Sequence, residues 1–177
     1  MYSPDGRIYQ VEYALETVKR GTLAIGIMTK DGIVLAVEEK TRALQVEGIT
    51  QKIFQVDDHI GVAAAGYIPD ARVQVDNARY FSQSNKLTYD EPVDIETVAK
   101  HLADQNHQFT QYSGVRPFGV ALIIAGIDRK GVNVYVIDPS GTYNSYSAIA
   151  IGTGSDEVNE FLEKNYKETI KETKQEL

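Results

Sequence analysis

Runs of residues that are apolar at nearly every position constrain the fold of this sequence more than any other feature. Residues 23–30 and 33–38 form one pair of such runs around Asp31-Gly32, a dipeptide typical of a tight β-hairpin. Continuous apolar runs indicate strands that are covered on both faces, because a strand with one solvated face alternates apolar and polar residues. The other predicted strands are residues 52–56 and 59–65, which share this pattern, and residues 120–127, 132–137 and 142–151.

Four segments have the spacing of helices. The first is predicted over residues 3–20, where Ser3 suits the N-cap and Pro4 the first turn. Its apolar residues form one stripe, at Ile8, Val11, Leu15 and Val18. Later helices begin near Pro69, after an N-cap at Asp94, and near Ser155. Hairpins, two helices, hairpins and a final helix indicate an α+β protein in which two packed sheets carry helices on the outside.

Composition excludes several classes of protein. The 177 residues suit one domain, and the absence of cysteine excludes disulfides, thiolate metal sites and a cysteine nucleophile. The formal charge of −7 is opposite to that of a nucleic-acid binder. No apolar run reaches the roughly 20 residues of a membrane helix, and the first residues, MYSPDGRIYQ, lack the basic-then-apolar pattern of a signal peptide. We therefore expect a cytoplasmic protein, present also in the nucleus if the source is eukaryotic, that binds neither nucleic acid nor membrane.

The histidines do not predict a metal centre. His59, His101 and His107 lack the spacing of ligands on one helix face. The segment 151–157, IGTGSDE, stands between a predicted strand and a predicted helix, as a dinucleotide-binding turn would, but Glu157 replaces the third glycine. A strand-to-helix turn is the simpler interpretation, and we expect no cofactor.

Thr22 is the strongest candidate for chemistry. A threonine hydroxyl becomes a useful nucleophile when a free N-terminal amine takes its proton, which here requires cleavage of the bond after Gly21. Glu38 and Lys52 are an acid and a base available to support such a site. From spacing alone, an ordinary threonine that opens a strand is the preferred interpretation of Thr22.

Four long motifs identify a family resemblance. They are YSPDGRIYQVEYALETVKRGT, KIFQVDDHIGVAAAGYIPDAR, QYSGVRPFGVALIIAGID and AIGTGSDEV. Together, in this order, they resemble the α-type subunits of the 20S proteasome, most like the archaeal form. The resemblance implies the N-terminal-nucleophile hydrolase fold, a four-layer αββα sandwich of antiparallel sheets, with residues 1–177 as one α-type domain. It also implies about a dozen further residues before SPDGR, and a helix and closing strands beyond residue 177.

The resemblance also implies a function. The β-type subunits of this family use an exposed threonine, whereas α-type subunits keep the preceding segment and are not proteolytic. Thr22, Glu38 and Lys52 then form only a vestigial outline of a catalytic site. The apolar stripe of the first helix supports this reading, because each residue buried contributes about 1.5–3 kcal/mol before ordering costs. The alternative is a β-type threonine peptidase that processes itself at Gly21-Thr22.

Partners follow from the same resemblance. Seven α-type subunits form a ring that caps the β-type subunits and gates the entry of unfolded protein substrates. The resemblance matches Lys52 and Gly66 to the pocket that receives the C-terminal tails of activator ATPases. A lysine there would face a terminal carboxylate, a contact of about 1.5–3 kcal/mol. Pro4 and Tyr13 match the residues that support the gate.

Overall fold

A computed structural model describes residues 2–40, 43–46 and 51–166. The elements in chain order are α1 (Tyr9–Arg20), β1 (Ala24–Thr29), β2 (Gly32–Val37), β3 (Ile53–Asp57), β4 (Ile60–Gly66), α2 (Ile68–Tyr89), α3 (Ile95–Gln111), β5 (Val120–Asp128), β6 (Gly131–Ile137), β7 (Tyr143–Ser145), β8 (Ala148–Ile151) and α4 (Ser155–Asn165). Residues 167–177, which the expected single domain includes, lie outside the described residues.

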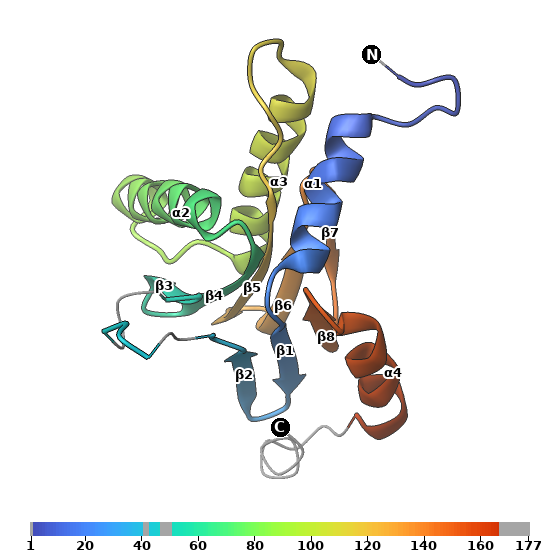
Figure 1. The fold of residues 1–177 in the computed structure, drawn as a ribbon. Coiled ribbons are helices and arrows are strands. Elements are labelled where there is room, and N and C mark those ends of the chain that lie inside the picture. Colours follow the sequence, from blue (N-terminus) through green and yellow to red (C-terminus); the bar gives the residue numbers. More distant parts are fainter. Residues whose placement is uncertain (1, 41–42, 47–50, 167–177) are drawn as a thin grey trace.

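The strands form two antiparallel sheets between helices (Figure 1). One sheet has five strands in the order β3-β4-β5-β6-β7, and the other has three in the order β2-β1-β8. Helices α2 and α3 pack on the outer face of the five-stranded sheet, and α4 packs against β8. Helix α1 lies against β4 and β5 on the inner side. The predicted α+β class and the order of helix, sheet, sheet and helix layers are confirmed.

Alternating residues of β4 and β5 supply two separate cores. Val62 and Leu122 belong to the core under α2 and α3, where Leu102 of α3 is fully buried. Their neighbours Ala63 and Ile123 belong to the core between the two sheets. The two central strands therefore need apolar residues at consecutive positions, as the sequence indicated. Strand β2 differs, because only its first residue is buried and the other five are partly exposed.

The first helix is shorter than predicted. It begins at Tyr9 rather than at residue 3, with Ile8 as N-cap. Ser3 and Pro4 lie instead in a turn before it, in which the Arg7 N–H donates to Ser3 Oγ at 3.0 Å. The Ser3 N–H in turn donates to the Arg7 carbonyl at 2.8 Å. Ser3 therefore closes a turn instead of capping the helix. Gly6, between Ser3 and Arg7, has a positive φ of 74°, which is not a helical conformation.

The last predicted strand, residues 142–151, is divided between the two sheets. Its first part is β7, which pairs with β6, and its second part is β8, which pairs with β1. The Tyr146 N–H donates to Val134 of the first sheet, and the Ser147 carbonyl accepts from Met28 of the second. One predicted strand therefore crosses from one sheet to the other within two residues.

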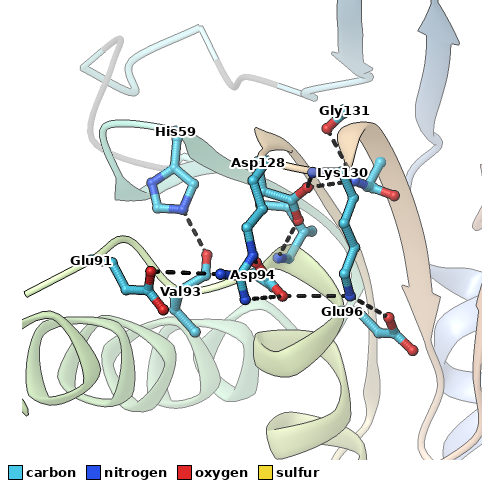
Figure 2. Close-up of polar contacts among 11 residues, drawn as sticks. His59, Glu91, Val93, Asp94, Glu96, Asp128, Lys130 and Gly131 are labelled. Carbon is cyan, nitrogen blue, oxygen red and sulfur yellow. Dashed lines mark hydrogen bonds and ion pairs between the residues drawn. The ribbon is translucent and has the colours of Figure 1, made fainter. Parts of the chain in front are cut away.

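Helix α3 begins after Asp94, as predicted, but another residue caps it. Asp94 makes no side-chain cap hydrogen bond. Asp128, at the end of β5, accepts the Ile95 N–H at 3.0 Å and also accepts from the Lys130 N–H at 2.8 Å. Figure 2 shows this carboxylate between the start of α3 and the β5–β6 turn. The Asp94 carboxylate instead pairs with Arg129 at 3.2 Å and with Lys130 at 3.4 Å.

Helix α4 is held by few contacts. None of its residues is buried, and Phe161 is 48% exposed. Asn159 bonds both the N–H and the carbonyl of Ala150, at 2.7 and 3.0 Å. The Tyr166 hydroxyl donates to the Met28 carbonyl at 2.8 Å. Two polar side chains thus tie this helix to the three-stranded sheet.

Candidate functional site

The candidate site lies where α1 ends and β1 begins, around Gly21 and Thr22. Gly21 ends α1 with its N–H bonded to the Val18 carbonyl. A Cβ at Gly21 would lie 2.2 Å from the backbone nitrogen of Gly66, so the two backbones pass in contact. Gly66 itself has a φ of 119°, which other residues rarely adopt. The sequence therefore needs glycine at both positions to seat α1 beside the end of β4.

Lys52 reaches this junction from the start of β3. Its side-chain ammonium donates to Thr22 Oγ1 at 2.6 Å and to the Thr22 carbonyl at 2.9 Å. It also donates to the carbonyls of Leu23 at 3.0 Å and Glu38 at 3.1 Å. Lys52 is buried, and burial lowers the pKa of its ammonium, while the charges of Glu38 and Glu39 oppose that shift. Four oxygens therefore share the three donors of one buried cation.

Glu38 contacts Lys52 through its backbone and not through the acid group that its candidate role requires. Its carbonyl, rather than its carboxylate, contacts the Lys52 ammonium. The carboxylate lies 3.7 Å from Lys40 Nζ and accepts the Leu23 N–H at 3.5 Å. The structure thus assembles all three residues of the predicted outline, but the Glu38 carboxylate acts on the Lys52 ammonium through its charge rather than through a hydrogen bond.

The glycine-rich turn before α4 closes the same junction. The Thr153 N–H donates to the Gly21 carbonyl at 2.7 Å, and the Thr153 hydroxyl lies 2.9 Å from the same oxygen. A Cβ at Gly152 would come within 2.7 Å of the Thr22 carbonyl. The turn is therefore packed against the chain in front of β1. The IGTGSDE segment therefore packs against the Gly21–Thr22 junction, which agrees with the strand-to-helix turn preferred from the sequence.

This arrangement holds the Gly21–Thr22 peptide but does not activate the threonine. The Thr22 nitrogen belongs to an amide, whose lone pair is delocalised and cannot accept the hydroxyl proton. The Lys52 ammonium donates to the hydroxyl rather than accepting from it. Within this geometry Thr22 is an acceptor in a packed junction rather than a nucleophile.

The predicted gate residues lie at the opposite end of α1. Pro4 is part of the turn over residues 3–7, which the Gly6 N–H closes by donating to the Ser3 carbonyl at 2.9 Å. Tyr13 is 70% exposed and stacks on Tyr9 with ring centroids 6.5 Å apart. Tyr13 lies on the second turn of α1 and Pro4 lies before the helix, whereas Gly66 contacts Gly21 after the helix ends, so the two pairs of residues stand apart.

An ion pair that the sequence did not reveal fixes the loop beside α1. Arg116, in the GVRPFG loop, donates two hydrogen bonds to the Asp70 carboxylate, at 2.6 and 2.9 Å. The Gly119 N–H adds a third at 2.9 Å. Burial alone would raise the pKa of Asp70, but the hydrogen bonds from Arg116 and Gly119 outweigh it and hold this pKa below its ordinary value. The pairing joins residues 46 apart in sequence, so no local signal indicates it.

The Arg116 guanidinium also lies over the Tyr67 ring, 5.6 Å from its centroid. Both residues line an open groove of about 440 Å³ that runs along α1 past Tyr13 and Thr17. The described ranges contain no group of three or more side chains suited to hold a metal ion. Within those ranges, no helix combines the length and apolar character needed to cross a bilayer.

Comparison with known proteins matches two family profiles to this chain. The profile described as "Proteasome subunit" matches residues 18–176, and the profile for the N-terminal signature of A-type proteasome subunits matches residues 1–16. Proteins named as the alpha subunit of the proteasome from Natronomonas pharaonis and Saccharolobus islandicus are 49% and 50% identical to it, over 96% and 98% of the chain. The chain spans 67% and 73% of those proteins, so it covers about two thirds to three quarters of their length. A namesake from Methanosarcina thermophila is 49% identical over 96% of the chain and 69% of its own length.

Proposed function

Because this chain belongs to the proteasome subunit family, with the α-type N-terminal signature, we propose that it acts as a non-catalytic α-type subunit of the 20S core particle. Its two packed antiparallel sheets with outer helices are the N-terminal-nucleophile hydrolase sandwich of this family. We propose that residues 1–177 form one domain, which joins others in a seven-membered ring stacked on β-type subunits. The ring works in intracellular protein degradation, in the cytoplasm.

The single observation that carries this proposal is the packed junction after α1. Val18 belongs to the core between the sheets, and Gly21 lies in contact with Gly66. Thr153 holds the Gly21 carbonyl with two hydrogen bonds. A segment anchored at these points is part of the folded core, and while it remains attached the Thr22 nitrogen is an amide nitrogen that cannot act as the base. This supports a scaffold in place of the alternative, a β-type threonine peptidase.

Two measurements on the purified protein test this proposal. Intact-mass spectrometry should find residues 1–21 retained, and negative-stain electron microscopy should find sevenfold rings. A mature chain that begins at Thr22 would overturn the non-catalytic assignment. Particles without sevenfold symmetry, at concentrations where related rings assemble, would overturn the ring assignment.

The gate and the docking pocket are finer parts of this proposal. The closed turn over residues 3–7 and the exposed Tyr9–Tyr13 stack give the segment before α1 and its first turns a defined shape, which supports a gate role for Pro4 and Tyr13. For Lys52 and Gly66, the support is the family position and the cationic charge of Lys52. The buried contacts of its ammonium mean that docking of an activator tail requires Lys52 to exchange a carbonyl for the tail carboxylate.

The docking role is tested with assembled particles. In Lys52→Ala particles, the ratio of activator-stimulated to unstimulated peptide hydrolysis should fall toward one. Rings are counted by microscopy in the same samples, so that loss of assembly is separated from loss of docking. A ratio equal to that of the unmodified protein would remove Lys52 from the pocket.

A further inference from the structure

The five-stranded sheet ends at β3, whose outer edge is not covered by any described strand. In the order β3-β4-β5-β6-β7, β3 has β4 as its one neighbour, and Figure 1 shows it at the margin of the sheet. The outer edge of such a strand presents backbone N–H and carbonyl groups that can pair with another chain. Proteins therefore close these edges, and β3 has a contact that does so.

The backbone hydrogen bonds of β3 indicate which residues face its outer edge. The Ala64 N–H of β4 donates to the Lys52 carbonyl at 3.0 Å, directly before β3 begins, so the Lys52 backbone faces β4. Successive residues of a strand direct their backbone groups to opposite edges. Ile53 and Gln55 therefore direct theirs away from β4. The register then shifts between Gln55 and Asp57, which ends this regular stretch.

Arg79 of α2 occupies the Gln55 carbonyl. Its Nε and Nη2 atoms both donate to this oxygen, at 2.9 and 2.8 Å. A carbonyl oxygen has two lone pairs, so the guanidinium uses both of them. The Nη1 atom donates to the Asp76 carboxylate at 2.9 Å, one turn earlier on α2, and this ion pair holds the guanidinium from its other side. A side chain of a helix thus takes the place that a neighbouring strand would need.

Helix α2 does not depend on this contact for its position. Its residues Ala71, Val75 and Ala78 are buried in the core over the five-stranded sheet, whereas the Arg79 side chain is 45% exposed. An exposed ion pair such as that between Arg79 and Asp76 contributes little to stability. The two donors that Arg79 places on one carbonyl therefore act mainly on the strand edge.

The edge that Arg79 covers is complementary to a second copy of itself. In an antiparallel pair with a two-fold axis at Phe54, Ile53 of each copy lies opposite Gln55 of the other. Both residues that face outward then exchange backbone hydrogen bonds with their opposites. The two Phe54 side chains meet as an aromatic cross-strand pair, which stabilises a sheet. Ile53 and Gln55 are uncharged, so no like charges oppose this pairing.

We propose that Arg79 keeps β3 from pairing edge to edge with β3 of a second copy. Pairing requires the Arg79 guanidinium to leave the Gln55 carbonyl, so the contact inhibits association at this edge. Copies of the chain are thereby restricted to association through other surfaces. This role of Arg79 goes beyond the ring assignment and does not depend on it.

A single cysteine reports edge pairing, because the native chain has none. In Gln55→Cys chains, a bismaleimide with a spacer of about 8 Å should join two copies whose β3 strands are paired, since diagonal neighbours on paired strands lie about 7–8 Å apart. With Arg79 in place, we expect little dimer on a denaturing gel. With Arg79→Met added, we expect about tenfold more dimer, because pairing no longer has to break a hydrogen bond from a charged group.

Three further variants separate the edge from other effects. Lys100→Met makes the same change of charge at an exposed residue of α3 and should leave the amount of dimer unchanged. Ile53→Lys, added to the Arg79→Met chain, should abolish the gain, because a lysine on a strand edge opposes pairing. Asp76→Ala removes the second partner of Arg79 from an exposed position and should raise the dimer by a smaller factor.

Circular dichroism of each variant establishes that it folds. Equal amounts of dimer with and without Arg79→Met would overturn the proposal. If that variant does not fold, the comparison of Asp76→Ala with Lys100→Met decides, and equal dimer in those two would overturn it instead. Neighbours in a ring contact each other through unlike surfaces, so the ring does not bring two copies of residue 55 together. The expected cross-linking in a chain that forms no rings would refute the ring and leave the role of Arg79 intact.

Discussion

The side-chain ammonium of Lys52 lies 2.6 Å from the hydroxyl oxygen of Thr22 and also contacts the carbonyls of Thr22, Leu23 and Glu38. One cation thus joins the start of β1 to the end of β2. The same geometry that outlines a catalytic site serves here as a structural clamp.

Replacing the clamp with an apolar side chain should destabilise the protein. In Lys52→Met, three partly buried carbonyls lose a donor, and we expect the free energy of unfolding to fall by about 2–4 kcal/mol. Urea denaturation followed by circular dichroism measures this change. The control Lys19→Met removes an exposed lysine of α1 and should change the free energy by less than about 0.5 kcal/mol. Equal effects of the two variants would contradict the clamp.

The contact between Gly21 and Gly66 should tolerate no side chain. Gly21 has φ −68° and ψ 151°, which alanine adopts without strain, so Gly21→Ala isolates the steric effect. The added Cβ would meet the backbone of Gly66, and we expect a loss of about 3 kcal/mol in thermal or urea unfolding. Gly61→Ala is the matched substitution, because its Cβ would meet only the tip of the Leu35 side chain at 3.3 Å. A Gly21→Ala protein as stable as Gly61→Ala would show that α1 is not seated by this contact.

The ion pair between Asp70 and Arg116 should contribute to acid sensitivity. Because the folded pKa of Asp70 is depressed, the unfolded state binds the proton first as pH falls. Its stabilisation is therefore complete above about pH 4 and is lost as the pH falls through the folded value. Asp70→Asn should lower stability at neutral pH by about 1.5–3 kcal/mol and make the remaining stability less dependent on pH below about 4.

The control for this prediction is Asp31→Asn. Asp31 is exposed in the β1–β2 turn, and asparagine before glycine suits that turn equally well. Its unfolding should follow the unmodified protein across the whole pH range. If Asp70→Asn also follows that curve, the depressed pKa has no consequence for stability.

The start of α3 should depend on a residue outside the helix. Asp128→Ala removes the acceptor of the Ile95 N–H and of the Asn133 side chain, and we expect a loss of about 2 kcal/mol. Asp94→Ala changes the residue at the N-cap position, but it breaks only ion pairs to the exposed Arg129 and Lys130. Those pairs contribute up to about 1 kcal/mol. Denaturation curves of the two variants compare them directly, and a larger loss for Asp94→Ala would place the cap at that residue instead.

Local signals predicted the elements of the fold well. The Asp31-Gly32 turn and the apolar runs of β4 and β5 could be predicted from the residues within each segment. The elements that differ depend on distant partners. Nothing within residues 142–151 marks the transfer from one sheet to the other, because the Tyr146 and Ser147 backbones bond strands far away in sequence. The capping of α3 by Asp128 was missed for the same reason.

The candidate site was predictable only in part. The resemblance placed Thr22, Glu38 and Lys52 together, and the structure does bring them to one junction. The resemblance could not indicate that the Glu38 carbonyl, and not its carboxylate, accepts from Lys52. That choice depends on how the end of β2 lies against the start of β3. The Asp70–Arg116 pair likewise depends on how the GVRPFG loop returns to α2.

The sparse anchoring of α4 has a consequence for motion. With no buried residue, the helix depends on the bonds of Asn159 and Tyr166 to the sheet beneath it. Local opening costs little where few apolar contacts must break, so its amide protons should exchange with solvent far sooner than those of β5. Each such excursion would release the Ala150 N–H and carbonyl of β8 from Asn159, and local opening would thereby turn a covered strand edge into one able to pair with another chain.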